Sequence, residues 1–160
     1  MKYTCIKTVA IYLLATLPLL ANASTHKVKI THSVMVGDGI AKFIPEGFDA
    51  QKIPSFAIEK EPREQGALPA DWVLVPEFSL TDGKANASLT VPEGTSIYGG
   101  GEVTGSLLRN GKTIKLWNTD SGAYGVDKGT RLYQSHPWMM GVRKDGTAFG
   151  ILFDTTWKAE

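Results

Sequence analysis

The sequence is poor in the side chains that build covalent or metal-held scaffolds. Its 160 residues include one cysteine, Cys5, and three histidines. A single cysteine excludes an intrachain disulfide, and so few cysteines and histidines provide no spaced cluster of ligands for a structural zinc ion. We therefore expect a domain that depends on burial of apolar side chains, with no metal site and no cofactor.

The sequence also lacks an excess of charge of either sign. Lysine and arginine together number 17, aspartate and glutamate number 16, and the formal net charge is +1. Proteins that bind nucleic acid or a membrane surface present a clear excess of basic side chains. Neither class of partner is expected here.

Two glycine-containing stretches lack the spacing of phosphate-binding loops. The segment Gly111-Lys112-Thr113 resembles the end of such a loop, but Ser106 stands where the motif needs its first glycine, and a strand-like pattern follows instead of a helix. Residues 98–105 (YGGGEVTG) lack the G-x-G-x-x-G spacing of a dinucleotide loop. Nucleotide binding is not expected, and the glycines at 99–101 predict a bend where backbone passes close to backbone.

No apolar run is long enough to cross a membrane as a helix. The run at residues 9–21 (VAIYLLATLPLLA) falls short of the roughly 20 residues that a spanning helix needs, and Pro18 interrupts it. Lys2 and Lys7 precede this run, and Ala21-Asn22-Ala23 offers small residues at the positions that a signal peptidase recognises. We interpret residues 1–23 as a cleaved signal peptide rather than a membrane anchor, which predicts a secreted or periplasmic protein.

A helical period is missing from the rest of the chain, and alternation of apolar and polar residues takes its place. Such alternation predicts half-buried strands at residues 27–31, 88–91, 113–117 and 149–153. Dipeptides that favour tight hairpin turns lie between alternating segments, at Asp38-Gly39, Asp82-Gly83, Asn110-Gly111 and Asp145-Gly146. The prediction is an all-β fold of antiparallel sheets packed as a β-sandwich, with a closed barrel as the alternative.

One stretch of the mature chain shows no alternation. Residues 59–71 (EKEPREQGALPAD) combine two prolines with several charges, which predicts a surface connection. This connection divides the mature chain in two. Residues 24–71 are expected to form an irregular N-terminal part of the sandwich together with the connection, and residues 72–160 its main segment.

Four short motifs follow one another in the second part of the chain. They are YGGGE at residues 98–102, LWNTD at 116–120, LYQSHPW at 132–138 and FGILFD at 149–154. As an ordered set they resemble glycoside hydrolase family 31, the α-glucosidase and α-xylosidase family. The resemblance is to the galactose-mutarotase-like β-sandwich that precedes the family's catalytic (β/α)8 barrel. It extends weakly back to Trp72 and leaves residues 24–71 unassigned.

The resemblance implies a role in substrate binding for Asp120, the last residue of LWNTD. In the family, an aspartate at this place reaches over the barrel mouth and accepts hydrogen bonds from hydroxyls of the bound sugar, as an ionised carboxylate is suited to do. Taken alone, residues 118–122 (NTDSG) are more typical of a turn. Trp117 is a weaker candidate for stacking on a sugar, because alternation also allows it to pack in the core. In the third motif, we interpret His136 as a structural hydrogen-bonding residue.

The motifs of bond cleavage are missing. Retaining glycosidases use two carboxylates about 5 Å apart, and the family's nucleophile lies in a Trp-x-Asp-Met-x-Glu strand of the barrel, a pattern that none of the four tryptophans begins. The resemblance thus implies a truncated, inactive N-terminal part of an exported retaining α-glycosidase. Its partners would be an α-linked oligosaccharide or glycoside and the catalytic barrel of the same chain. The alternative is a free-standing, non-enzymatic carbohydrate-binding or adhesive β-sandwich.

The signal-peptide hypothesis predicts that the exported protein starts at Ser24. Ala21 and Ala23 are the last pair of small residues before the polar mature sequence. N-terminal sequencing of exported material checks this start, and recovery of protein that retains Met1 would contradict it.

Overall fold

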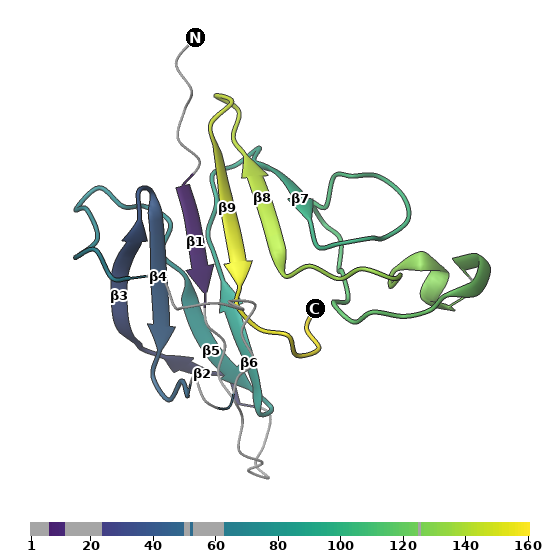
Figure 1. Ribbon diagram of the computed structural model, residues 1–160, viewed down its shortest axis with the longest axis horizontal. Helices are drawn as coiled ribbons and strands as arrows, with labels where there is room; N and C mark the ends of the chain where they lie inside the picture. Colours follow the sequence, from purple (N-terminus) through teal and green to yellow (C-terminus); the bar gives the residue numbers. More distant parts are fainter. Residues whose placement is uncertain (1–6, 12–23, 50–51, 53–62, 125) are drawn as a thin grey trace.

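The computed structural model describes residues 7–11, 24–49, 52, 63–124 and 126–160 (Figure 1). These residues form strands and two short 3-10 helices, which confirms the prediction of an all-β fold. The strands are β1 (Lys7–Ile11), β2 (His26–Val28), β3 (Ile30–Gly37), β4 (Ile40–Pro45), β5 (Glu77–Thr81), β6 (Lys84–Ser88), β7 (Ser96–Gly99), β8 (Trp138–Val142) and β9 (Ala148–Phe153). The 3-10 helices are η1 (Gly122–Tyr124) and η2 (Val126–Gly129).

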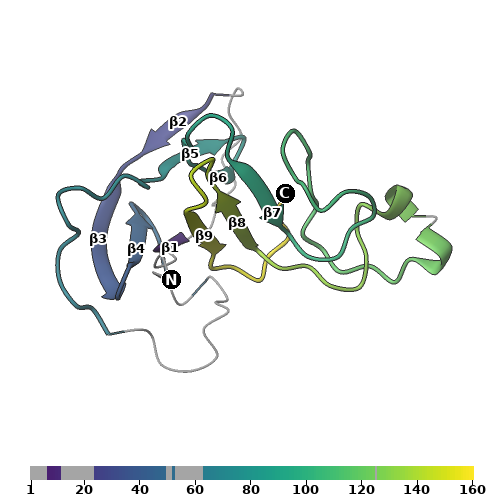
Figure 2. The same cartoon turned by 90° about the horizontal axis from the view of Figure 1, so that it is seen from above.

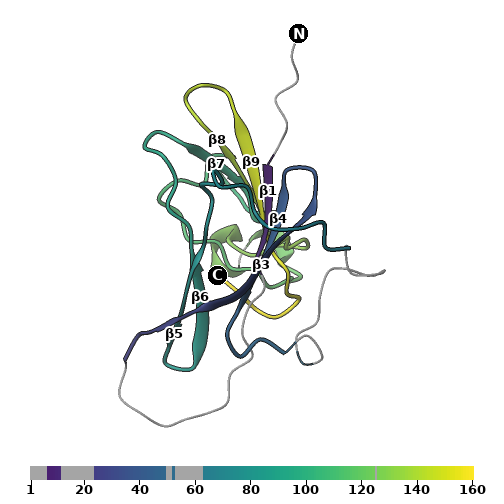
Figure 3. The ribbon, with the colours of Figure 1, turned by 90° about the vertical axis from the view of Figure 1, so that its left-hand side faces the viewer.

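The strands make two sheets that pack face to face (Figure 3). The larger has six strands in the order β3-β4-β1-β9-β8-β7, and the smaller has three in the order β2-β5-β6. The core draws on both sheets: Phe43 from β4 and Phe149 from β9 are buried against Phe78 from β5. Apolar faces that meet in this way are the reason why two half-buried sheets form a sandwich. The predicted sandwich is confirmed, in preference to a closed barrel.

Strand β1 is the exception to the antiparallel pairing. It pairs parallel to β4 on one side, with Val9 opposite Ala41, and parallel to β9 on the other, with Val9 opposite Ile151. The other neighbouring strands of both sheets run antiparallel. Strand β1 also falls inside the segment interpreted as a signal peptide, of which residues 1–6 and 12–23 lie outside the described part of the chain.

The Asp-Gly dipeptides form turns where the sequence places them. They join β3 to β4, β5 to β6 and β8 to β9. Asp82 and Gly83 both have positive φ angles, 51° and 70°, as a type I′ turn requires. Gly39 and Gly146 supply the positive φ in the other two hairpins.

The Asn110-Gly111 dipeptide forms a turn but no hairpin. The Asn110 side chain takes the place of a strand partner at the edge of the large sheet, because its Oδ1 accepts a hydrogen bond from Ile97 N (2.8 Å) and its Nδ2 donates to Thr95 O (2.8 Å). The side-chain amide thus satisfies a backbone N–H of edge strand β7 and the carbonyl of Thr95 just before it, groups that a neighbouring strand could otherwise satisfy.

Two predicted strands are wrong. Strand β6 ends at Ser88, and residues 89–91 continue outside any ladder, although Leu89 and Val91 still pack against the core. Residues 113–117 form a loop with a single bridge, from Leu116 to Ala159. Apolar and polar residues alternate in both segments, but neither segment pairs with a neighbouring strand. The single bridge at Leu116 is too short to make a ladder.

The predicted surface connection is exposed where the structure describes it, from residue 63 onward, with Leu68 half-buried. It runs along β3, since Met35 N donates to Gly66 O (2.8 Å) and Gln65 N donates to Met35 O (2.7 Å). Residues 53–62 lie outside the described part. Residues 26–45, on the N-terminal side of this connection, supply β2, β3 and β4. The division of the chain at residue 71 stays a prediction.

Removal of the leader would take β1 from the centre of the large sheet. We expect a polypeptide of residues 24–160 to associate and to bind a hydrophobic dye, because the edges of β4 and β9 and the apolar faces beside them lose their neighbour. Size-exclusion chromatography and dye fluorescence, with residues 1–160 as the control, measure this. A monomer with a sharp cooperative melt would instead favour the free-standing module.

Candidate functional site

The candidate site lies on loops that leave one end of the large sheet. Strand β7 ends, β8 begins and β9 ends at the same edge, because β8 runs antiparallel to both neighbours. Residues 100–137 leave this edge and extend away from β3 and β4, as the ribbon shows from two directions (Figures 1 and 2). The predicted site residues Trp117 and Asp120 both belong to these loops.

The three consecutive glycines let two of these loops meet closely. A Cβ atom at Gly99 would collide with the Trp138 carbonyl, and one at Gly101 with the Gln134 carbonyl. All three glycines have positive φ, which is costly for any other residue. The close backbone approach predicted for residues 99–101 is therefore confirmed, and it brings Glu102 beside the segment around Tyr133.

Hydrogen bonds fix the second and third motifs side by side. Asn118 Oδ1 accepts from Ser135 N (2.9 Å), and Thr119 N donates to Leu132 O (2.8 Å). From the first motif, Glu102 Oε2 accepts from Tyr133 N (3.2 Å). Three segments that are far apart in the sequence thus form one loop cluster around Asp120.

Asp120 lies at the exposed surface of this cluster and accepts a hydrogen bond from the Tyr133 phenol. That bond raises the pKa of Tyr133, and the negative charges of Asp120 and Glu102 raise it further. Both effects favour the neutral phenol, which can donate to the carboxylate, over the phenolate, which cannot. The Tyr133 phenol and the exposed Asp120 carboxylate thus form a donor and acceptor pair on the surface of the loop cluster.

The structure brings Trp117 to the surface, with 48% of its side chain exposed. The alternative prediction, that Trp117 packs in the core, is therefore wrong. Residues 113–117 form a loop, and they do not form a strand that faces the second sheet. Trp117 instead lines a cleft together with Trp157, which follows β9 and which the sequence analysis did not propose. The remaining members of the third motif differ in role: Trp138 begins β8 and packs over Gly150, and exposed His136 has Gln134 Oε1 at 3.4 Å from its Nε2.

Tyr133 is the partner of Asp120 that sequence reasoning missed. It was noted as part of the motif but given no task, because only the folded loops bring it to Asp120. Among the described residues no three or more histidines, cysteines, aspartates or glutamates gather in a way that would hold a metal ion. The same part of the chain contains no helix long and apolar enough to cross a membrane.

Comparison with known proteins agrees with this fold. Residues 55–160 match the family described as the glycosyl hydrolase 31 N-terminal galactose mutarotase-like domain. Because the match covers well over half of the chain, the protein belongs to this family. The match also reaches further back than Trp72, where the resemblance drawn from the motifs faded.

Two curated relatives are named as glucosidases. The chain is 48% identical over 66 residues to alpha-glucosidase 2 of Bacillus thermoamyloliquefaciens, covering 41% of this chain and 8% of that protein. It is 42% identical over 80 residues to an alpha-glucosidase of Hordeum vulgare, covering 48% of this chain and 9% of that protein. The matched region therefore spans less than a tenth of the length of either relative.

The contact between Asp120 and Tyr133 predicts a linked titration. Replacing Asp120 by Asn removes the negative charge and the strong acceptor, so the pKa of Tyr133 should fall toward the ordinary value near 10. A titration of carbon-labelled tyrosine by NMR measures this, with Tyr133→Phe to assign the signal. Asp71→Asn, at another exposed aspartate, is the matched control and should leave the titration unchanged. An equal shift in both variants would show that the contact is absent in solution.

Proposed function

We propose that this chain is the substrate-contacting N-terminal β-sandwich of an exported retaining α-glycosidase, and that Asp120 binds hydroxyl groups of the sugar to be cleaved. The observation that carries the proposal is the exposed Asp120–Tyr133 pair, on loops of a domain whose family accompanies glycoside hydrolases. The whole enzyme would hydrolyse O-glycosyl bonds of an α-linked oligosaccharide or glycoside. That role belongs to carbohydrate metabolism.

The chemistry of Asp120 suits this role. Its carboxylate only accepts hydrogen bonds, and sugar hydroxyls are donors that can use the lone pairs left by Tyr133. The phenol holds the carboxylate in one orientation before the sugar arrives, so less conformational freedom is lost on binding. Asp120 thus acts in binding and orientation, whereas the bond is cleaved by carboxylates of the barrel.

The isolated domain is proposed to be inactive. Retention of configuration needs a nucleophile and an acid about 5 Å apart. The two carboxylates of the loop cluster are engaged elsewhere, because Asp120 interacts with the Tyr133 phenol and Glu102 Oε2 accepts from Tyr133 N. Export through the predicted signal peptide would place the enzyme in the periplasm or outside the cell. There it would meet glycosides before uptake.

The decisive variant is Asp120→Ala in the full-length enzyme. A hydrogen bond to a charged group is worth about 1.5–3 kcal/mol, so kcat/KM on the best α-glycoside should fall roughly ten- to a hundredfold. The fold should persist, because Asp120 is exposed. Steady-state kinetics together with circular dichroism measure both.

Asp71→Ala is the matched control, since Asp71 is also an exposed aspartate but lies outside the loop cluster. It should retain full activity. An Asp120→Ala enzyme with unchanged kcat/KM would show that Asp120 serves the loop only as a turn residue. An unfolded variant would show a structural role instead.

A further inference from the structure

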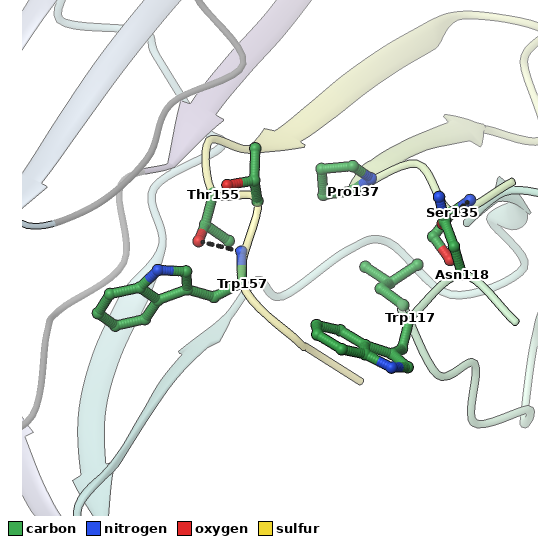
Figure 4. A pocket seen from close by; sticks show the side chains of 8 residues that line it. Trp117, Asn118, Ser135, Pro137, Thr155 and Trp157 are labelled. Carbon is green, nitrogen blue, oxygen red and sulfur yellow. Dashed lines mark hydrogen bonds between the residues drawn. The ribbon is translucent and has the colours of Figure 1, made fainter.

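A cleft opens beside the loop cluster, between the loop that carries Trp117 and the segment that follows β9 (Figure 4). It has a volume of about 470 Å³ and is lined chiefly by Trp117, Asn118, Ser135, Thr155, Thr156 and Trp157. Backbone hydrogen bonds between Leu116 and Ala159 tie its two sides together, from Leu116 N to Ala159 O (2.7 Å) and from Ala159 N to Leu116 O (3.3 Å). The volume lies in the range of small-molecule sites.

Two tryptophans contribute aromatic surface to the cleft, beside Leu116 and Pro137. The side chain of Trp117 is 48% exposed and that of Trp157 is 43% exposed. Large apolar rings that gather at one exposed place are typical of a binding surface. In the view of Figure 4, the two indole rings lie below Thr155 and Pro137, which also line the cleft. Flat aromatic faces of this kind pack against the C–H faces of a sugar ring and leave its hydroxyls free at the rim.

The polar groups of the cleft are neutral and held in place. The bond from Ser135 N to Asn118 Oδ1 (2.9 Å) fixes the plane of the Asn118 amide and so directs its Nδ2 donors. Thr155 Oγ1 accepts from Trp157 N (3.1 Å), which fixes the backbone that carries the second indole. None of the described residues that line the cleft carries a charge. Amide, hydroxyl and indole groups without an ion suit a neutral polyol and not a phosphate or a cation.

The position of the cleft relates it to Asp120. Asp120 is two residues beyond Asn118, a separation of about 7 Å at most along an extended backbone, and it does not line the cleft. A sugar bound at Asp120 and a ring in the cleft are therefore neighbours and not competitors.

We infer that the Trp117–Trp157 cleft binds a further glycosyl unit of a neutral oligosaccharide whose reacting unit is held by Asp120. This inference rests on the proposed function. Trp117 and Trp157 then determine the chain length that the enzyme prefers. Asp120 contributes equally to every substrate, whereas the tryptophans contribute only to substrates long enough to reach them.

The test uses the full-length enzyme with two kinds of substrate. Trp157→Ala should raise KM for α-1,4-linked gluco-oligosaccharides of three to six units roughly three- to tenfold, the size of an aromatic stacking contact. It should leave kcat/KM for α-glucosyl fluoride, which has no second ring to reach the cleft, unchanged. Trp157→Phe, which keeps an aromatic face, should restore most of the affinity. Leu107→Ala, which truncates an exposed apolar side chain on another loop, is the control and should alter neither substrate class.

Each result decides the inference. If Trp157→Ala weakens the action on substrates of every length equally, or if Trp157→Phe does not restore the affinity, the cleft serves domain packing and the inference is wrong. If Trp157→Ala changes neither KM nor kcat/KM for any substrate, the inference is also wrong. If the enzyme cleaves no α-glycoside, the proposed function fails, and the cleft is judged by quenching of tryptophan fluorescence with maltohexaose. Quenching that Trp157→Ala removes would then support the cleft as a sugar site, and absence of quenching would reject it.

Discussion

The large sheet depends on one strand position, the place between β4 and β9 that β1 fills. On one side lie β3 and β4, and on the other lie β9, β8 and β7. In the described part of the chain, β1 alone hydrogen-bonds to both halves. Buried backbone groups need partners, so whatever segment holds this position decides whether the two halves form one sheet. The sequence pattern predicts that the same residues belong to a cleaved signal peptide. The signal peptide and strand β1 are compatible with the same sequence feature, because a short apolar run is typical of a signal peptide and of a buried strand.

The joined sheet is also what positions the loop cluster. Strand β9 contributes Phe149 and Ile151 to the core and ends beside the start of β8. Residues 100–137 connect the end of β7 to the start of β8, and the segment with Trp157 follows β9. Because β9 pairs with β8, burial of β9 helps to fix one end of each segment. Loops can hold functional side chains accurately only where a rigid scaffold sets their ends. The glycines at 99–101 complete the arrangement, since any side chain at Gly101 would push the Gln134 backbone away and separate Glu102 from Tyr133.

The sequence predicted best what depends on a few adjacent residues. The Asp-Gly turns formed because positive φ at Gly39, Gly83 and Gly146 is a local preference. Alternation was less reliable, because it reports burial on one face and not pairing. Residues 113–117 alternate without a ladder, and Trp72 to Phe78 alternate between buried and exposed side chains although only the end of that stretch belongs to β5. The site shows the same limit. Asp120 came from the resemblance, whereas Tyr133 and Trp157 came only from contacts between distant segments.

The Asp120–Tyr133 pair has a consequence for how the two domains of the proposed enzyme would divide their tasks. Because the pKa of Tyr133 is raised, the phenol stays a neutral donor through the neutral and mildly alkaline range, and its bond to the Asp120 carboxylate persists there. In the proposed enzyme, the donor beside Asp120 would then be the same at every pH in that range. The response of activity to pH in this range would come from the catalytic carboxylates, whose acid must be protonated and whose nucleophile must be ionised. In the proposed enzyme, Tyr133 would keep its proton in this range, and the barrel would supply the acid and base chemistry.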